Sequence, residues 1–334
     1  MSIRFQKAAA LSNFSRYNPN SGRGFYESYF IRANHPKDPK AFWIRYTLFS
    51  PKSKPKEGIG ELWVIYFDGA EIFSSKTELP WSQCQFPRKQ FSVQIGDSYI
   101  NNVVAKGQSN HLQWDIDYSS EQPPLFLLPL SMYTAPFPKA KSIVSQPFAT
   151  FNGSINIGNK QFLIDNWLGS QNHNWGQKHT DFYAWGQVAG FDNSPATFLE
   201  IVTAKLVVGG IDTPFITLMV LRHEGSTYRL NTTACWLRNK GSFDYFQWDF
   251  ECMTQQIVVK GQIKASKDAF IGLKYKNPIG GFKNCLNSKL ASCSLEINET
   301  KATGMPQALY TQHRCAFEIL TNEGKEHHGI HINF

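Results

Sequence analysis

Short runs of alternating apolar and polar residues recur along this chain at spacings of roughly ten to fifteen residues. Gly, Asn, Pro or Ser closes most runs, and long amphipathic helical windows are nearly absent. This pattern is typical of an all-β barrel or sandwich. The predicted strands are Phe25–Ile31, Ala41–Phe49, Glu61–Phe67, Phe91–Ile95, Leu112–Tyr118, Phe198–Val208, Ile216–Arg222, Tyr245–Cys252, Gln256–Ile263, Ser294–Ile297 and Arg314–Leu320.

Turn residues refine this picture. Gly158 and Asn159 separate two apolar runs, so the stretch 155–164 is predicted to be a tight hairpin. The proline-rich stretch 122–147 is the least strand-like part of the chain, because proline cannot donate to a strand ladder. A short helix is predicted within 278–289, and the His-rich stretch 326–331 is interpreted as the last strand.

The length of 334 residues favours two domains of ~150 residues each. Aromatic residues make up 14% of the chain and charged residues only 18%, which favours β structure with aromatic-lined interiors. We therefore predict two lipocalin-like antiparallel β domains in tandem, with little helix. Their expected ranges are 1–180 and 181–334, with the boundary placed within 145–200.

The net charge of +8 comes from scattered basic residues. A solvated basic surface explains it, and attraction to anionic lipid at a membrane surface, or to a phosphorylated substrate, stays open as the alternative. No nucleic-acid-binding motif accompanies the charge, so we expect no nucleic-acid partner.

The six cysteines show no C-x-x-C spacing, which argues against a zinc or redox motif. The N-terminus leads into no apolar signal region, and no window holds ~18 apolar residues. We expect a cytoplasmic protein with reduced thiols. His173 and His179 lack a third ligand of clear spacing, so we also expect no metal.

Amide, imidazole and indole groups crowd the stretch from Gln171 to Gln187. A core prefers aliphatic side chains, whereas a pocket for an apolar ligand combines aromatic rings with a few polar groups. Candidate catalytic residues are His173, Glu200 and Glu27. Candidate substrate-binding residues are Tyr29, Tyr66, Asn172, Asn174, Trp175, Tyr183, Trp185, Gln187 and Phe198.

Three motifs in order resemble the group that contains tocopherol cyclase, carotenoid 1,2-hydratase (hydroxyneurosporene synthase) and AttH-like proteins. They are Tyr26-Glu27-Ser28-Tyr29-Phe30, Asn174-Trp175-Gly176 and Tyr183-Ala184-Trp185-Gly186-Gln187. The resemblance implies two lipocalin-like β domains. Carotenoid hydratases pair a His-x-Trp with a downstream Tyr-x-acid. This chain has His173-Asn174-Trp175, followed downstream by Phe198-Leu199-Glu200.

The predicted chemistry is the hydration or cyclisation of an isoprenoid or polyene substrate without a redox cofactor; we expect no cofactor at all. It begins with delivery of a proton to an apolar double bond, from Glu200, Glu27 or His173. Aromatic rings then stabilise the carbocation by ~0.5–2 kcal/mol each. Two other readings stay open. One is a protein that binds a lipophile without catalysis, and the other is a pericyclase that works by pocket shape, as in fungal Diels–Alderases of related fold.

Each candidate also has a structural interpretation. His173 is equally consistent with a hydrogen-bonded structural histidine, and the tryptophans with core packing. Glu27 can pair with Arg45 on the next strand, and Glu200 can be solvated on an outer face.

Overall fold

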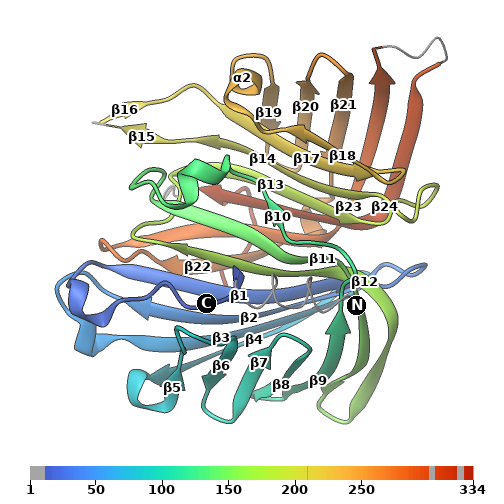
Figure 1. Cartoon of the computed structure of the whole chain (residues 1–334). Helices are drawn as coiled ribbons and strands as arrows, with labels where there is room; N and C mark the ends of the chain where they lie inside the picture. Colours follow the sequence, from blue (N-terminus) through green and yellow to red (C-terminus); the bar gives the residue numbers. More distant parts are fainter. Residues whose placement is uncertain (1–11, 209, 301–304, 322–326, 334) are drawn as a thin grey trace. The chain divides into compact units, whose positions relative to one another are not determined.

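The computed structural model describes residues 12–208, 210–300, 305–321 and 327–333, which are almost entirely antiparallel β structure (Figure 1). Residue contacts divide the chain into two compact units. Unit 1 comprises Met1–Phe126, Pro136–His179 and Lys276–Gly281. Unit 2 comprises Leu127–Ala135, Thr180–Tyr275 and Phe282–Phe334. The prediction of two lipocalin-like β domains is confirmed.

Unit 1 is built on a sheet with the strand order β4-β3-β2-β1-β12-β11-β9-β8-β7-β6-β5, with β10 beside β11. Its strands are β1 (Phe25–Asn34), β2 (Lys40–Ser50), β3 (Ile59–Asp68), β4 (Glu71–Pro80), β5 (Cys84–Gln85), β6 (Ser92–Ile95), β7 (Ser98–Asn101), β8 (Val104–Ser109), β9 (Leu112–Ser119), β10 (Leu125–Phe126), β11 (Ala140–Ile157) and β12 (Lys160–Gly176). Short 3-10 helices lie at Pro19–Ser21, Pro55–Glu57 and Trp81–Gln83.

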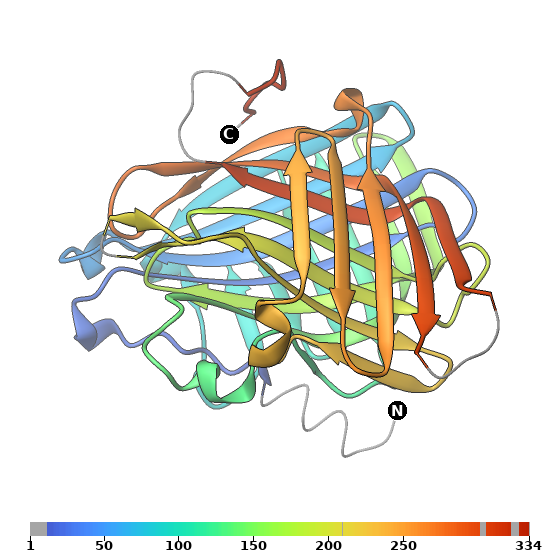
Figure 2. The ribbon, with the colours of Figure 1, turned by 90° about the horizontal axis from the view of Figure 1, so that it is seen from above.

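Unit 2 is built on a sheet with the order β18-β17-β14-β13-β24-β23-β21-β20-β19, with β22 beside β23 and a separate β15–β16 pair. Figure 2 shows its orange and red strands side by side. The strands are β13 (Phe182–Ala189), β14 (Phe198–Lys205), β15 (Val207–Val208), β16 (Ile211–Asp212), β17 (Ile216–His223), β18 (Ser226–Leu230), β19 (Lys240–Asp244), β20 (Gln247–Met253), β21 (Ile257–Lys264), β22 (Ile271–Lys276), β23 (Phe282–Glu299) and β24 (Gln307–Thr321). Helical turns lie at Leu130–Tyr133, Thr233–Trp236 (α2) and Lys267–Ala269.

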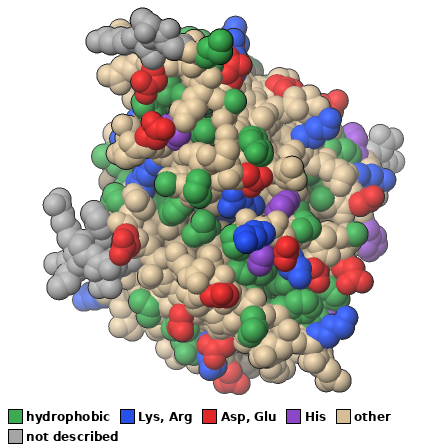
Figure 3. Space-filling view, turned by 90° about the vertical axis from the view of Figure 1, so that its right-hand side faces the viewer, with side chains coloured by type: hydrophobic (Ala, Val, Ile, Leu, Met, Phe, Trp, Pro, Cys, Tyr) green, Lys and Arg blue, Asp and Glu red, His purple; other side chains and the backbone are tan. Residues whose placement is uncertain are grey.

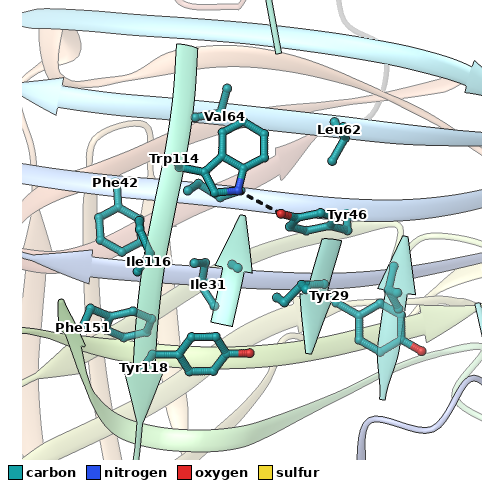
Figure 4. Close-up of a cluster of buried hydrophobic side chains, with 14 of the residues drawn as sticks. Tyr29, Ile31, Phe42, Tyr46, Leu62, Val64, Trp114, Ile116, Tyr118 and Phe151 are labelled. Carbon is teal, nitrogen blue, oxygen red and sulfur yellow. Dashed lines mark hydrogen bonds between the residues drawn. The ribbon is translucent and has the colours of Figure 1, made fainter. Parts of the chain in front are cut away.

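Alternation directs the side chains of unit 1. Along β9 every second residue is buried, from Leu112 through Trp114 and Ile116 to Tyr118. These side chains join an apolar core in which the Trp114 indole N–H donates to the Tyr46 hydroxyl at 2.9 Å (Figure 4). The indole N–H is thus satisfied where water is excluded.

The predicted hairpin at 155–164 is confirmed, because β11 and β12 meet at a turn in which Ile157 pairs with Lys160. Gly158 in this turn adopts a φ of 57°, a conformation that glycine accepts without a steric cost.

Two predictions about the C-terminal third are wrong. The expected helix within 278–289 is instead the start of β23, which pairs with β24. The expected last strand at 326–331 is reduced, in the described part 327–333, to one bridge between Gly272 and Ile332. In the first case the pairing with a neighbouring strand overrides local preference.

Within the described residues, no helix is long and apolar enough to cross a membrane. On the face shown in Figure 3, basic side chains are intermixed with acidic and uncharged ones.

Candidate functional site

A buried carboxylate and imidazole meet inside unit 1. Glu27 lies on β1 and Tyr29 follows on the same face, opposite Trp175 and His173 of β12 in the antiparallel register. The Glu27 Oε1 and His173 Nε2 atoms are 2.9 Å apart, and both side chains are fully buried. Because the register places all four residues on one face, β1 and β12 alone assemble the pair and its aromatic neighbours.

The chain segment before β1 supplies the other partners of this pair. The Ser15 hydroxyl donates to Glu27 Oε2 at 2.6 Å, and the Arg16 backbone N–H donates to Oε1 at 2.7 Å. The Ser12 carbonyl oxygen lies 2.8 Å from His173 Nδ1. The carboxylate and both ring nitrogens therefore have partners within unit 1.

These contacts define where protons lie. A carbonyl oxygen only accepts, so Nδ1 of His173 carries a proton toward Ser12. The 2.9 Å contact between Nε2 and Glu27 then requires one further proton between these two atoms. The Ser15 hydroxyl and the Arg16 backbone N–H also donate to Glu27, so its carboxylate is the common acceptor of this group. The site thus holds a transferable proton at a buried position.

Aromatic rings flank the imidazole. The Tyr29 ring stacks on it with centroids 4.3 Å apart, and the Trp175 ring lies at 4.7 Å. The Tyr29 hydroxyl is buried and makes no hydrogen bond of ordinary geometry. Burial, followed by the nearby Glu27 charge, raises the pKa of Tyr29 well above its usual value. Tyr29 is therefore a neutral phenol beside the pair.

Three other predicted residues of unit 1 lie apart from the pair. Asn172 is opposite Phe30 in the register, so it points to the other face of the sheet, where its amide donates to Ser170. Asn174 is on that face too and is half-buried. The Tyr66 ring packs on Phe162 in the apolar core, with centroids 4.6 Å apart.

A second group of predicted residues gathers in unit 2. Glu200 on β14 accepts from the Trp185 indole N–H at 2.8 Å and from the Gln187 amide at 2.7 Å, both on β13. Phe198 and Tyr183 share this face by alternation; Phe198 is buried and Tyr183 half-buried. The opposite face, which carries Leu199 and Ile201, forms the apolar core of the unit.

The sequence interpretation missed the residues that extend this second group. Glu318 of β24 lies opposite both Trp185 and Asn287 in the strand register. The fully buried Lys289 ammonium lies 2.8 Å from Glu318 Oε1 and 2.5 Å from the Asn287 amide oxygen. It also lies 5.7 Å from the centre of the Trp185 ring.

Alternation along β23 puts Lys289 on the same face as Asn287, and a bulge follows directly after it. Inward-facing positions on β23 are even-numbered up to Ser288 and odd-numbered from Ala291, where the register with β24 shifts. The extra residue lies between Ser288 and Ala291. Bulges re-aim side chains in this way, and no sequence motif marked this one.

Two structural interpretations are wrong. Arg45 pairs with Phe30 in the register and therefore lies on the face opposite Glu27, where its guanidinium donates to the Ser28 hydroxyl at 2.6 Å. Glu200 is only 2% exposed, so it is not a solvated outer-face residue. The predicted residues form two groups, with Glu27, Tyr29, His173 and Trp175 in unit 1 and Trp185, Gln187 and Glu200 in unit 2.

Within the described residues, no group of three or more His, Cys, Asp or Glu side chains could hold a metal ion. His179 stacks on Tyr26, with ring centroids 4.0 Å apart, and its Nε2 lies 3.2 Å from the Lys276 carbonyl oxygen. This histidine serves packing in unit 1 rather than the pair around His173.

Sequence comparison identifies distant relatives. No protein-family model matches the chain. Two uncharacterized proteins of Mycobacterium tuberculosis, Rv0493c of strain H37Rv and MT0513 of strain CDC 1551, are each 23% identical to it over 281 residues. The match covers 82% of this chain and 82% of each relative.

Two solved structures share the fold. A putative AttH (NE1406) from Nitrosomonas europaea superposes with a TM-score of 0.56 at 11% identity, covering 90% of this chain and 93% of that one. Kievitone hydratase from Nectria haematococca superposes with a TM-score of 0.57 at 11% identity, covering 92% and 91%. The chain thus has the fold of AttH-like proteins and of a hydratase. The resemblance to tocopherol cyclases stays a prediction.

Proposed function

We propose that this protein is an enzyme that adds water to, or cyclises, a lipophilic isoprenoid or polyene alkene by proton transfer. The observation that carries the proposal is the buried contact of 2.9 Å between Glu27 and His173, flanked by the Tyr29 and Trp175 rings. The shared fold with a kievitone hydratase supports it, because that protein is named as a hydratase.

In the proposed step, the imidazolium of His173 gives its proton to one alkene carbon. A C–H bond forms from the π electrons, and the other carbon becomes a cation. The Tyr29 and Trp175 rings would lower the energy of this cation by ~0.5–2 kcal/mol each. Water then adds to the cation and loses a proton to the Glu27–His173 pair, so that one molecule of water is added overall. In cyclisation, a second double bond of the substrate attacks the cation and a proton returns to the pair.

Glu200 is the second candidate acid. It is 2% exposed, and the Trp185 ring whose N–H it accepts offers a neighbouring aromatic face. A carboxyl group in this position can protonate an alkene only in its neutral form. If the Glu27–His173 pair supplies the proton, Glu27→Gln should lose turnover; if Glu200 supplies it, Glu200→Gln should lose turnover instead.

A non-catalytic role has one specific observation in its favour. The carboxylate of Glu27 and both ring nitrogens of His173 are bound by groups of the chain itself, as in a purely structural pair. The protein would then bind a lipophile without converting it. A pericyclase, which works by pocket shape, remains the third proposal, and contact with an anionic membrane surface stays a prediction.

The decisive experiment incubates pure protein with a polyene-containing lipid extract and compares product masses with the starting lipids. Added mass of one water indicates hydration, and an unchanged mass at a new retention time indicates cyclisation. We expect His173→Ala and Glu27→Gln to abolish turnover while binding, followed by tryptophan fluorescence, persists. The exposed Glu224→Gln serves as the control variant.

Loss of turnover in Glu200→Gln instead would move the acid to unit 2. Unchanged turnover in all three acid-site variants would favour the pericyclase. Binding without any product would favour the non-catalytic role.

A further inference from the structure

Three loops of unit 1 meet beside the end of β2. They are the stretches 21–24, 51–58 and 277–281. The Ser53 N–H donates to the Gly22 carbonyl at 3.1 Å, and the Lys52 N–H donates to the Pro278 carbonyl at 2.9 Å. Gly24 packs so closely on Pro278 that an added Cβ would lie 2.5 Å from the Pro278 carbonyl oxygen. The loops therefore form one continuous surface, which we call the three-loop surface.

The exposed charged side chains of this surface are mostly basic. Arg23, Lys52, Lys54 and Lys56 are all exposed. Glu57 is the acidic residue of these loops, and its carboxylate lies 2.9 Å from the Lys54 ammonium. Four positive charges and one negative charge leave a net charge of +3 on the three loops. Because the side chains are solvent-exposed, this charge attracts an anionic partner.

An exposed apolar side chain lies beside these charges. The Gly280 N–H donates to the Asn277 carbonyl at 2.8 Å, which closes a tight turn. Ile279 is the third residue of this turn and is 56% exposed. Glycine and short polar residues are the usual occupants of such turns. The turn therefore holds an isoleucine in water, and its transfer to an apolar layer would be favourable.

We propose that the three-loop surface docks on an anionic membrane, with Ile279 inserted at the lipid interface and Arg23, Lys52 and Lys56 against the headgroups. A membrane surface that carries anionic lipid attracts clustered lysines and arginines. The boundary between headgroups and acyl chains accepts an apolar side chain. A soluble phosphorylated ligand would use the charges but would leave Ile279 in water, so the combination favours a membrane.

This inference is independent of the proposed chemistry. It gives the membrane contact expected from the net charge a place on the molecule, and it would bring the protein to the phase in which a lipophilic substrate dissolves. Its test uses no substrate and no turnover, so the docking surface and the catalytic proposal can fail separately.

The experiment is co-sedimentation of the whole protein with vesicles of two compositions. One contains equal amounts of phosphatidylcholine and phosphatidylserine, and the other contains phosphatidylcholine alone. We expect binding to the first, and about 100-fold weaker binding to the second. Salt should weaken binding to the first, because the Debye length falls from ~10 Å at 0.1 M to ~3 Å at 1 M.

Two variants separate the charges from the apolar tip. Lys52→Gln combined with Lys56→Gln should weaken binding to the anionic vesicles about 30-fold. Ile279→Ser should weaken it about 5–30-fold, because the apolar side chain no longer leaves water. All three side chains are exposed, so we expect the variants to fold, which circular dichroism checks.

Matched control variants lie around the other end of β12. Lys106→Gln combined with Lys160→Gln removes the same charge, and Leu163→Ser removes a side chain that is 72% exposed. Both should bind the anionic vesicles like the unchanged protein. Absence of vesicle binding, or equal losses in surface and control variants, overturns the proposal. Unchanged binding in Ile279→Ser also overturns it, because the surface would then be a site for polyanions in general.

Discussion

Replacing Glu27 with glutamine tests whether the buried pair is charged. Glutamine has nearly the same shape, and its amide oxygen can still accept from the Arg16 N–H and from His173. Hydrogen bonds to a charged acceptor contribute about 1.5–3 kcal/mol, and neutral ones about 0.5–1.5 kcal/mol. Glu27 accepts three such bonds, from Ser15, Arg16 and His173. Weakening each by about 1 kcal/mol predicts a loss of about 3 kcal/mol in the free energy of unfolding.

This estimate agrees with the ~3–5 kcal/mol typical for breaking a buried ion pair by removing one partner. The assay is urea unfolding at pH 7, followed by circular dichroism and by tryptophan fluorescence. Coincident transitions are required before a free energy is assigned, since the chain has two units. A loss below ~0.5 kcal/mol, less than one ordinary neutral bond, would refute the charged pair. It would indicate that Glu27 is already neutral in the folded protein.

Three further predictions concern stability, each measured by urea unfolding. Lys289→Met should lower the free energy of unfolding by ~3–5 kcal/mol, because the buried Glu318 loses its ammonium partner. The double variant Lys289→Met/Glu318→Gln should recover most of this loss, and an equal loss in the single and the double variant would contradict the prediction. Burial raises the pKa of Glu78, but the contacts with Lys276 and Lys76 outweigh burial and lower this pKa below 4.5. The ionised Glu78 therefore stabilises the fold at neutral pH, and this contribution is lost as the pH falls below 4.5. Lys276→Met should therefore destabilise more at pH 7 than at pH 3, and an equal effect at both would reject the ion pair. Gly186→Ala should lower the free energy of unfolding by ~1–3 kcal/mol, because the added Cβ would lie 2.5 Å from a methyl carbon of Ile263. An unchanged urea midpoint would show that the core adjusts to the methyl group.

Much of the first group could be predicted because strand alternation is a local property. Alternation alone placed Glu27 and Tyr29 on one face of β1, and the motif around His173 lies on the neighbouring strand. Pairing Glu27 with Arg45 failed because the residue directly opposite Glu27 is Leu48, while Arg45 lies opposite Phe30. Register depends on the whole hairpin, and a shift of one position moves a side chain to the other face.

The second group was predicted only in part, for a different reason. Trp185, Gln187 and Glu200 were visible as aromatic and polar residues in short strands. Lys289 was missed because it lies in the stretch that was predicted to be a short helix, whereas the structure places it on β23. The candidates divide between the two units because the chain passes from unit 1 to unit 2 between β12 and β13.

The assignment of Lys276–Gly281 to unit 1 has a consequence for the order in which the protein is made. This short stretch follows nearly a hundred residues of unit 2, yet it interacts with Glu78 and with His179 of unit 1. During synthesis, which adds ~5–20 residues per second, the first unit must wait until residue 281 has left the ribosome before its last contacts form. A gene fragment that stops at residue 180 would therefore encode a first unit that lacks its final segment.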